Sequence, residues 1–370
     1  MATSDVVVIG GGIIGCSIAW RLAGEGVRVT LVERERPGAE ASSAAEGLLL
    51  PDGRHYGPPE LLSFWLESLR MYPDFVAALQ QETGMPFEFR RSGRVLIATS
   101  EQELQGYQAA LPAEREAGVR VESWSAEQLR QAEPAVRPDV VGALFYPDHG
   151  LVDNRRLVVC LAIAAARRGV LIRTGKPVTG LLRQGDRVTG VDVCGEHVPA
   201  GAVVNAAGCW AGLVDQGVRV PVRPAKGQAL ALEMYPPLCE RIIAGAGGSL
   251  VARADGRHLM GSTVEDVGYD KRVTAAGVGS LLSRATAFMP RLADATVVET
   301  WAGLRPVTAD KVPLLGPSSL EGLTIATGHF TMGILSAPAT AEAVTGLIVK
   351  GASPIPIGAF DPTRTIAGEA

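Results

Sequence analysis

The stretch DVVVIGGGIIGCSIAW, residues 5–20, decides the fold of the first part of the chain. It opens with a β-branched run typical of a strand buried on both faces, and the glycines that follow predict a tight turn into a helix. A second run of the same kind, VRVTLVER, occupies residues 27–34. Strand, helix and strand in this order indicate a βαβ unit, the beginning of a parallel sheet.

The glycines of this stretch have a spacing that predicts a nucleotide site. Gly10, Gly12 and Gly15 match G-x-G-x-x-G, in which the first glycine permits the turn, the second lets a pyrophosphate approach the backbone, and the third lets helix and strand pack closely. Glu33 follows Gly15 after 18 residues, near the spacing expected for an acid that binds a ribose hydroxyl. An acid here disfavours a 2′-phosphate, which leaves FAD or NAD.

The rest of the chain predicts two interleaved domains. A length of 370 residues favours about two domains. We expect an α/β fold, in which a doubly wound, Rossmann-like nucleotide domain alternates with a substrate domain built on a mixed or antiparallel sheet. The predicted nucleotide domain comprises residues 1–84, 146–219 and 301–365, and the substrate domain comprises residues 85–145 and 220–300. Within these, residues 60–83 should be a helix broken at Pro73, and the last dozen residues a loose tail.

Composition excludes several classes of function. The 35 basic and 39 acidic residues give a net charge of −4, which does not favour nucleic acid, and no block of basic residues suggests a membrane surface. The five cysteines are scattered without a C-x-x-C pair, which suits reduced thiols in the cytoplasm. We expect no secretion signal and no integral membrane span. No metal site is expected, because the five histidines show no metal-ligand spacing; they are His55, His149, His197, His258 and His329.

Five further segments carry a resemblance to a known family. The segments are SSAAEGLLLP (42–51), VVNAAGCWA (203–211), WAGLRPVTAD (301–310), PLLG (313–316) and ATGHFTMGILSAPAT (326–340). In their order along the chain they resemble the D-amino-acid oxidase family of flavoproteins, and within it most closely the glycine oxidases of thiamine thiazole biosynthesis. The resemblance implies FAD rather than NAD. It also implies a noncovalent flavin, since the segment after Arg305 offers no cysteine or histidine for a covalent link.

The resemblance assigns the cofactor-binding residues. It implies that the small residues of SSAAEGLL let the backbone at Ala45, Gly47 and Leu48 lie against the flavin ring. It also implies contacts of residues 206–208 with the adenosine half, and amides of residues 333–335 facing the pyrimidine edge, where a helix N-terminus favours negative charge. Pro338 would be tolerated as part of the first helical turn. The candidates are Gly10, Gly12, Ile13, Ile14, Gly15, Glu33, Arg34, Ser42, Ser43, Ala44, Ala45, Gly47, Leu48, Val178, Ala206, Ala207, Gly208, Trp210, Gly303, Arg305, His329, Phe330, Thr331, Met332, Gly333, Ile334 and Leu335.

Arg305 is the candidate with the clearest chemistry. It lies between apolar and small neighbours, and its nearest acid in sequence is Asp310, five positions away. A buried guanidinium needs an anionic partner, and the resemblance implies that this partner is the substrate carboxylate, although a salt bridge to a distant acid is the alternative. Three further candidates for the substrate side depart from the glycine oxidase pattern; they are Ser249, Val264 and Thr331. Glu46 also departs from it, because a small residue is usual there.

The function that follows is that of an FAD-dependent oxidase. We expect it to deaminate glycine or another small amino acid or secondary amine, such as sarcosine or a D-amino acid, to an imine and a keto acid, with dioxygen reduced to hydrogen peroxide. A D-amino-acid or D-hydroxyproline type of dehydrogenase that passes electrons to a quinone is the first alternative, and a noncatalytic flavin-binding protein is the second. A homo-oligomer is compatible with the sequence.

Overall fold

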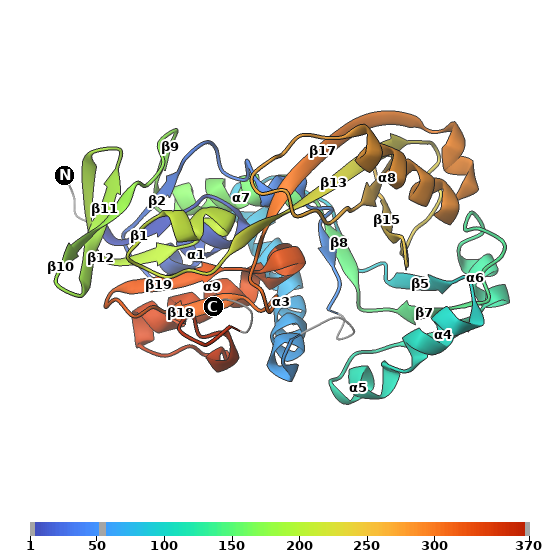
Figure 1. The fold of residues 1–370 in the computed structure, drawn as a ribbon, viewed down its shortest axis with the longest axis horizontal. Coiled ribbons are helices and arrows are strands. Elements are labelled where there is room, and N and C mark those ends of the chain that lie inside the picture. The colour runs from blue at the N-terminus through green and yellow to red at the C-terminus, as the bar shows by residue number, and fades with distance from the viewer. Residues whose placement is uncertain (1–3, 52–56, 367–370) are drawn as a thin grey trace.

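The computed structural model describes residues 4–51 and 57–366. Two β-sheets lie side by side along the long axis of the molecule, each with its own helices (Figure 1). The chain passes between the two halves several times, because the strands of each sheet come from separate stretches of sequence. The α/β fold expected from the sequence is confirmed, including the interleaving of its two parts.

The first sheet has a parallel centre with β1 in the middle. β1 pairs in parallel with β2 and β12, β2 with β9, and β12 with β19, whereas the outer strands β10, β11 and β18 pair antiparallel. β1 is fully buried over Val6–Ile9, as the β-branched run predicts. The strands are β1 (Ser4–Ile9), β2 (Val29–Glu33), β9 (Leu171–Thr174), β10 (Gly180–Gln184), β11 (Arg187–Val193), β12 (Glu196–Asn205), β18 (Leu314–Pro317) and β19 (Leu323–Thr327).

Four helices cover this sheet and share one apolar core; they are α1 (Ile13–Gly24), α3 (Pro59–Thr83), α7 (Asn154–Arg167) and α9 (Gly333–Lys350). The segment Phe330–Lys350 is long and apolar enough to cross a membrane. However, 67% of its 18-residue apolar window is buried inside the fold, as in the core helix of a globular protein. The expected break at Pro73 is wrong, because α3 continues through it. Its apolar face is buried on both sides of the proline, and this packing offsets the lost backbone hydrogen bond.

The second sheet is almost entirely antiparallel. Its order is β17-β13-β16-β15-β14-β5-β7-β6, in which only β14 and β5 pair in parallel. Helix α8 (Ala275–Phe288) packs on β13, β15 and β16, and α4 (Glu101–Gln108), α5 (Leu111–Glu116) and α6 (Ala126–Ala132) lie at the β6–β7 end. The strands are β5 (Arg94–Ala98), β6 (Glu122–Ser125), β7 (Gly142–Tyr146), β13 (Arg223–Glu233), β14 (Ile242–Gly245), β15 (Gly248–Ala252), β16 (Arg257–Gly261) and β17 (Thr296–Val307).

Short elements connect the two halves. A small antiparallel sheet has the order β3-β8-β4. Its members and the other short elements are α2 (Ala41–Ala44), β3 (Leu48–Leu49), β4 (Phe89–Arg90), β8 (Gly150–Val152), and the 3₁₀ helices η1 (Gly208–Leu213), η2 (Pro290–Asp294), η3 (Phe330–Met332) and η4 (Gly358–Phe360). The predicted domain boundary at residue 301 falls inside β17, which pairs with β13 on both sides of it.

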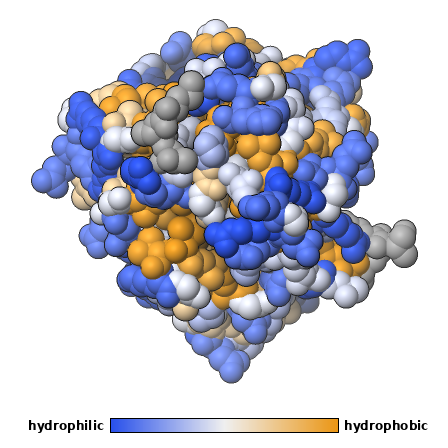
Figure 2. All heavy atoms as spheres, turned by 90° about the vertical axis from the view of Figure 1, so that its left-hand side faces the viewer, coloured by the Kyte–Doolittle hydropathy of each residue, from blue (hydrophilic) through white to orange (hydrophobic). Residues whose placement is uncertain are grey.

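The last described residues of the chain, up to residue 366, are tied to the fold. Within the described residues, Phe360 is fully buried and Ile366 is 4% exposed. Arg364 forms a two-pronged ion pair with Asp310 at 3.0–3.1 Å. The expectation of a loose tail is therefore wrong up to residue 366, because the motif beginning at Trp301 supplies an acid that holds it. The face at the β10–β11 end of the molecule is mostly hydrophilic, with smaller apolar areas between the charged side chains (Figure 2).

Candidate functional site

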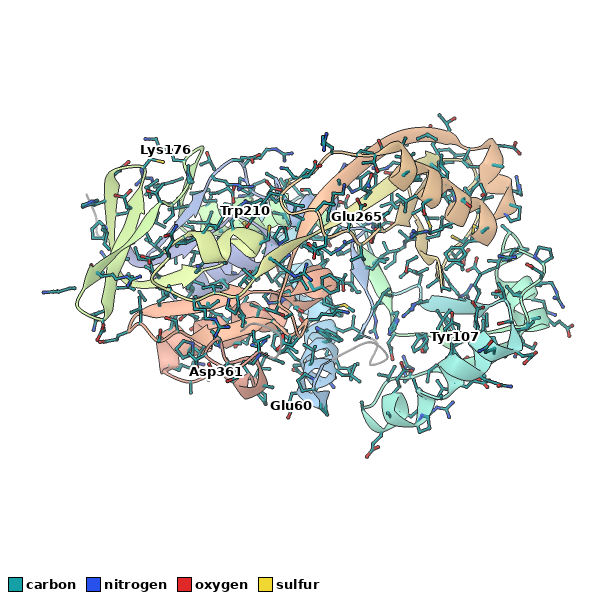
Figure 3. All side chains as sticks on the ribbon, viewed as in Figure 1. Glu60, Tyr107, Lys176, Trp210, Glu265 and Asp361 are labelled. Atoms are coloured by element: carbon teal, nitrogen blue, oxygen red, sulfur yellow. The ribbon has the colours of Figure 1, made fainter. Side chains whose placement is uncertain are left out.

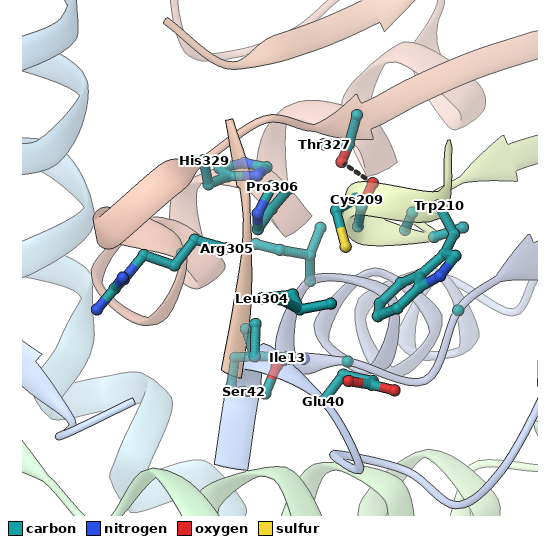
Figure 4. A pocket seen from close by; sticks show the side chains of 18 of the residues that line it. Ile13, Glu40, Ser42, Cys209, Trp210, Leu304, Arg305, Pro306, Thr327 and His329 are labelled. Atoms are coloured by element: carbon teal, nitrogen blue, oxygen red, sulfur yellow. Dashed lines mark hydrogen bonds between the residues drawn. The ribbon is translucent and has the colours of Figure 1, made fainter. Parts of the chain in front are cut away.

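A single cavity runs from the carboxyl ends of β1 and β2 to β13 and β17 of the second sheet. Figure 4 shows Arg305 and Trp210 on opposite sides of it, with Ile13 and Ser42 between them. Most of the predicted site residues line this cavity: Gly10, Gly12, Ile13, Ile14, Glu33, Arg34, Ser42, Ala44, Ala45, Val178, Ala206, Ala207, Gly208, Trp210, Gly303, Arg305, His329, Phe330, Thr331, Gly333 and Ile334.

The glycine loop forms the wall at the β1 end of the cavity. Gly10 has a φ of +102°, and a Cβ there would lie 2.5 Å from the Ala206 carbonyl oxygen. A Cβ on Gly15 would lie 1.9 Å from the Gly10 carbonyl oxygen. At Gly12 the nearest atom to an added Cβ is Ser42 Oγ at 3.2 Å. Gly10 and Gly15 are therefore required by the protein itself, whereas Gly12 leaves space on the cavity side, as a phosphate loop requires.

Acidic and aromatic groups follow the loop. Glu33, at the end of β2, is 8% exposed, and its carboxylate accepts hydrogen bonds from the backbone N–H groups of Gly11 at 2.6 Å and Glu35 at 2.8 Å. The Arg34 guanidinium stacks 3.6 Å from the centroid of the Trp210 ring, a cation–π contact. Glu40 pairs with both Arg34 and Lys271. Figure 3 places Trp210 over the first sheet and Glu265 beside β13.

Arg305 occupies the opposite end, on β17. In the ladder with β13, Gly227 faces Gly303, and the Arg305 guanidinium lies over Gly227, where a Cβ would come within 2.2 Å of its nitrogens. Arg305 Nη2 donates to Ser262 Oγ at 2.5 Å, and Nη1 donates to the Thr263 carbonyl at 3.2 Å. Asp310, the nearest acid in sequence, is engaged by Arg364 instead. The second sheet therefore aims a guanidinium into the cavity.

The loop between α2 and β3 carries Glu46 into the same end of the cavity. Arg253, 5% exposed, holds this loop: it donates to the Glu46 carbonyl and, at 3.1 Å, to the Val152 carbonyl. Gly47 has a φ of +75° and no room for a Cβ, which would lie 2.0 Å from the Val152 carbonyl oxygen. Desolvation raises the pKa of the Glu46 carboxyl, and the positive charges of Arg305 and Arg253 partly oppose this increase.

The segment before α9 closes the cavity on a third side. His329 is 5% exposed, hydrogen-bonds Thr340 Oγ1 through Nε2 at 3.1 Å, and has its pKa lowered to about 4 by burial, so its ring is neutral at pH 7. Phe330 has a φ of +47°, and α9 begins at Gly333.

The explanation predicted for Pro338 is wrong, because this residue lies in the second turn of α9 rather than the first. Its missing N–H removes the donor that the Ile334 carbonyl would otherwise receive. The Tyr72 hydroxyl, on α3, donates to that carbonyl at 2.5 Å, and Ser68 Oγ donates to the Leu335 carbonyl at 2.6 Å. Two side chains of α3 thus complete the backbone of α9 beside the cavity.

Some predicted residues do not line the cavity. Val264 is 66% exposed, and Ser249 faces Gly261 in the β15–β16 ladder. The others are Gly15, Ser43, Gly47, Leu48, Met332 and Leu335. Sequence reasoning missed Gly227, Ser262 and Glu40, which do line it. The glycine before a buried strand run, in KGQALAL (226–232), is the one signal that would have pointed to Gly227.

Among the described residues, no group of three or more histidine, cysteine or acidic side chains is placed to hold a metal ion, and His55 lies outside them. All five cysteines are free thiols. Cys209, which lines the cavity, has its pKa raised to about 12 by burial. It is therefore a neutral thiol and not a nucleophile.

Comparison with known proteins decides the family. Residues 5–347 match the family of proteins described as DAO, FAD dependent oxidoreductase. The chain belongs to this family. It is an FAD-dependent oxidoreductase, as the glycine loop and the five segments predicted.

Relatives within the FAD-dependent oxidoreductases span the length of the chain. It is 35% identical to the bifunctional protein ThiO/ThiG of Trichormus variabilis over 94% of this chain and 53% of that protein. It is 32% identical to the hydrogen cyanide synthase subunit HcnC of Pseudomonas aeruginosa, covering 98% and 96%. The crystal structure of glycine oxidase from Geobacillus kaustophilus superposes with a TM-score of 0.94 at 30% identity, covering 99% and 100%. The chain spans about half the length of the ThiO/ThiG proteins.

The residues present fit the FAD of this family. The cavity joins an open glycine loop and the Glu33 carboxylate to a wall of small residues, and its far end holds a cationic side chain. At that wall the backbone of Gly303 packs closely against Ala44, because a Cβ on Gly303 would lie 2.3 Å from the Ala44 Cβ. This donor and acceptor set suits a dinucleotide.

Proposed function

We propose that the chain oxidises a small amino acid or secondary amine whose carboxylate binds Arg305. The observation that carries the proposal is the Arg305 guanidinium, aimed into the cavity over Gly227 and held by Ser262 Oγ at 2.5 Å. The glycine oxidase of similar fold supports this choice of substrate class. A guanidinium binds a carboxylate through two parallel hydrogen bonds, which fixes the orientation of the α-carbon as well as its position.

The residues of this chain supply binding and orientation. Arg305 would hold the carboxylate and thereby present the α-carbon hydrogen to the flavin, so that positioning provides much of the rate. Gly12, Glu33 and the amides at the start of α9 would hold the cofactor, and the neutral His329 would keep the loop before α9 in place. FAD, when bound, accepts two electrons with the hydride from the α-carbon.

The proposed reaction is a two-electron oxidation of the amine. The amine loses a hydride from carbon and a proton from nitrogen, which gives an imine, and water converts this imine to a keto acid and ammonia or an amine. Dioxygen takes up the two electrons and two protons and becomes hydrogen peroxide. Production of peroxide, like the identity of the substrate, is part of the proposal.

A substrate panel tests the proposal. Anaerobic bleaching of the flavin is measured with glycine, sarcosine, D-alanine, D-proline and larger D-amino acids, and peroxide per turnover is then measured in air. We expect at least one of these to bleach the flavin and to give one peroxide per turnover. Bleaching without peroxide would identify a dehydrogenase that uses another acceptor, such as a quinone. No bleaching by any amine would identify a noncatalytic flavin protein.

The size of the substrate depends on Thr331, which lines the cavity and is exposed. We propose that this short side chain, which departs from the glycine oxidase pattern, admits substrates larger than glycine. Each additional buried methylene would then contribute roughly 0.8 kcal/mol. Ser249 and Val264 stay candidates for the substrate side, although neither lines the cavity.

We also propose the compartment, the pathway and the domain division of the enzyme. The five free thiols suit a reducing cytoplasm, and the similarity to the ThiO/ThiG proteins supports a role in thiamine biosynthesis. The predicted domain division, with residues 1–84, 146–219 and 301–365 binding FAD, and the noncovalent attachment of FAD are retained as proposals.

A further inference from the structure

Glu46 is a charged side chain that the proposed function does not use. It lines the substrate end of the cavity, and its carboxylate lies over Gly261 at the end of β16, where a Cβ would come within 1.5 Å of Oε1. Gly261 therefore makes the room that this carboxylate occupies. Glu46 belongs to the loop between α2 and β3, whereas Arg305 belongs to β17. The two side chains therefore come together only in the folded chain.

Two consecutive residues, Gly261 and Ser262, bring the two charges to one place. Ser262 Oγ accepts a hydrogen bond from Arg305 Nη2 at 2.5 Å, and the Glu46 carboxylate lies over the neighbouring Gly261. The two groups are close enough for the positive charge of Arg305 to act on the Glu46 carboxyl. An α-amino acid carries its ammonium and its carboxylate on one carbon, so it offers the two opposite charges close together.

The remaining charge near Glu46 is already engaged. Arg253 faces the loop, but its guanidinium donates to the carbonyls of Glu46 and Val152 and pairs with Glu88 at 3.4 Å. Among the described residues, Arg305 and Arg253 are the charged groups that act on the Glu46 carboxylate. Within that part of the chain, Arg305 and Glu46 are therefore the cation and the anion that line the substrate end of the cavity.

We propose that Glu46 is a specificity-determining residue that makes this site select zwitterions, with the ligand ammonium paired to Glu46 and the ligand carboxylate paired to Arg305. This inference rests on the proposed function, because it takes Arg305 as the carboxylate anchor. A carboxylate without an amine meets the negative charge of Glu46, and an amine without a carboxylate meets the positive charge of Arg305. Both are discriminated against by repulsion as well as by a lost ion pair.

The protonation of Glu46 gives the selection a pH dependence. Burial raises the pKa of this carboxyl above its ordinary value, against the opposing charges of Arg305 and Arg253. As the pH falls through that pKa, Glu46 becomes neutral and the site gains a net positive charge. A simple carboxylate should then bind more tightly, whereas a zwitterion loses its ammonium partner and should bind less tightly.

A matched pair of ligands tests the proposal without turnover. 2-Aminoisobutyrate has no α-hydrogen and cannot be oxidised at that carbon, and pivalate has the same shape with a methyl group in place of the ammonium. Binding of each to the oxidised holoenzyme is followed by the change in the flavin absorption spectrum. We expect the wild type to prefer 2-aminoisobutyrate by at least about tenfold, and Glu46→Gln to bind pivalate at least as tightly as 2-aminoisobutyrate.

Controls separate the possible failures. Glu321→Gln removes a surface carboxylate paired with Arg187 and should keep the wild-type preference. If Glu46→Gln also keeps it, the role of Glu46 is wrong while the proposed function stands. If the wild type binds neither ligand, or Arg305→Leu binds both unchanged, the carboxylate anchor itself is wrong. Should Glu46→Gln lose its flavin, the wild-type pH series decides: affinities for the two ligands that do not change in opposite directions overturn the proposal.

Discussion

Arg305 is the residue from which the substrate class is inferred, and its removal separates binding of cofactor from binding of substrate. We expect Arg305→Leu to retain FAD and to lower kcat/KM for amino acids by about 30-fold or more, since a lost charge-assisted bidentate contact costs on the order of 2–5 kcal/mol. Steady-state kinetics and flavin content measure both effects. A small amine without a carboxylate, such as ethylamine, should lose much less. Equal losses for both kinds of substrate would show that Arg305 has a structural role.

Gly12 and Gly15 differ in what a side chain would meet, which gives a second prediction for single residues. A Cβ on Gly12 points to the open side of the loop, so Gly12→Val should fold but bind little FAD. A Cβ on Gly15 overlaps the Gly10 carbonyl at 1.9 Å, so Gly15→Ala should lower the free energy of unfolding instead. Flavin content and urea denaturation compare the two variants. Stoichiometric FAD in Gly12→Val would contradict the assignment of this loop.

Helix α9 shows at the scale of an element how one helix completes another. Pro338 deprives the Ile334 carbonyl of its backbone donor, and Tyr72 of α3 replaces that donor at 2.5 Å. Burial raises the pKa of the Tyr72 hydroxyl, so it stays protonated and can donate. This hydrogen bond therefore holds the start of α9, which lines the cavity, in one position relative to α3.

We expect Tyr72→Phe to lower the free energy of unfolding by about 1–3 kcal/mol, because a buried carbonyl loses its partner. Denaturation in urea measures the change. The matched control is Tyr235→Phe, which removes a hydroxyl from an exposed side chain that bonds the Asp255 carbonyl and should change stability far less. Similar effects of the two substitutions would mean that water, rather than Tyr72, satisfies the Ile334 carbonyl.

At the scale of the whole molecule, residues of both sheets line the cavity, so a ligand bound there would contact both halves. FAD should therefore stabilise both halves together. At a free FAD concentration of 100 times its Kd, we expect the apoprotein to gain about 2.7 kcal/mol in free energy of unfolding. Denaturation of the apoprotein with and without FAD tests this, with riboflavin, which lacks the pyrophosphate and the adenosine, as the weaker control. If FAD raised the stability of only one of two resolved transitions, the cavity would not join the halves.

How much the sequence predicts depends on how local the determining contacts are. The βαβ unit, the glycine loop and the buried parallel strands follow from neighbouring residues, because turn geometry and hydrophobic period are set within about twenty positions. The family resemblance added Arg305 and the small residues around it. The sequence did not predict helix α8, in contrast, because its region alternates between apolar and polar residues as strands do. The break at Pro73 was predicted from the proline alone, without the packing that overrides it.

The sequence by itself determined the family, the cofactor, the fold class and a single cation in an apolar segment. Only the tertiary structure decided what surrounds that cation: Gly227, Ser262 and Glu46 come from three other segments and reach Arg305 through sheet register and loop placement. It also brought the Tyr72 hydroxyl to the Ile334 carbonyl, which lacks a backbone donor because of Pro338, and Arg364 to Asp310. The physical reason is that charge pairing and carbonyl satisfaction act over a few ångströms in space, whatever the distance along the chain, and sequence periodicity carries no record of such distances.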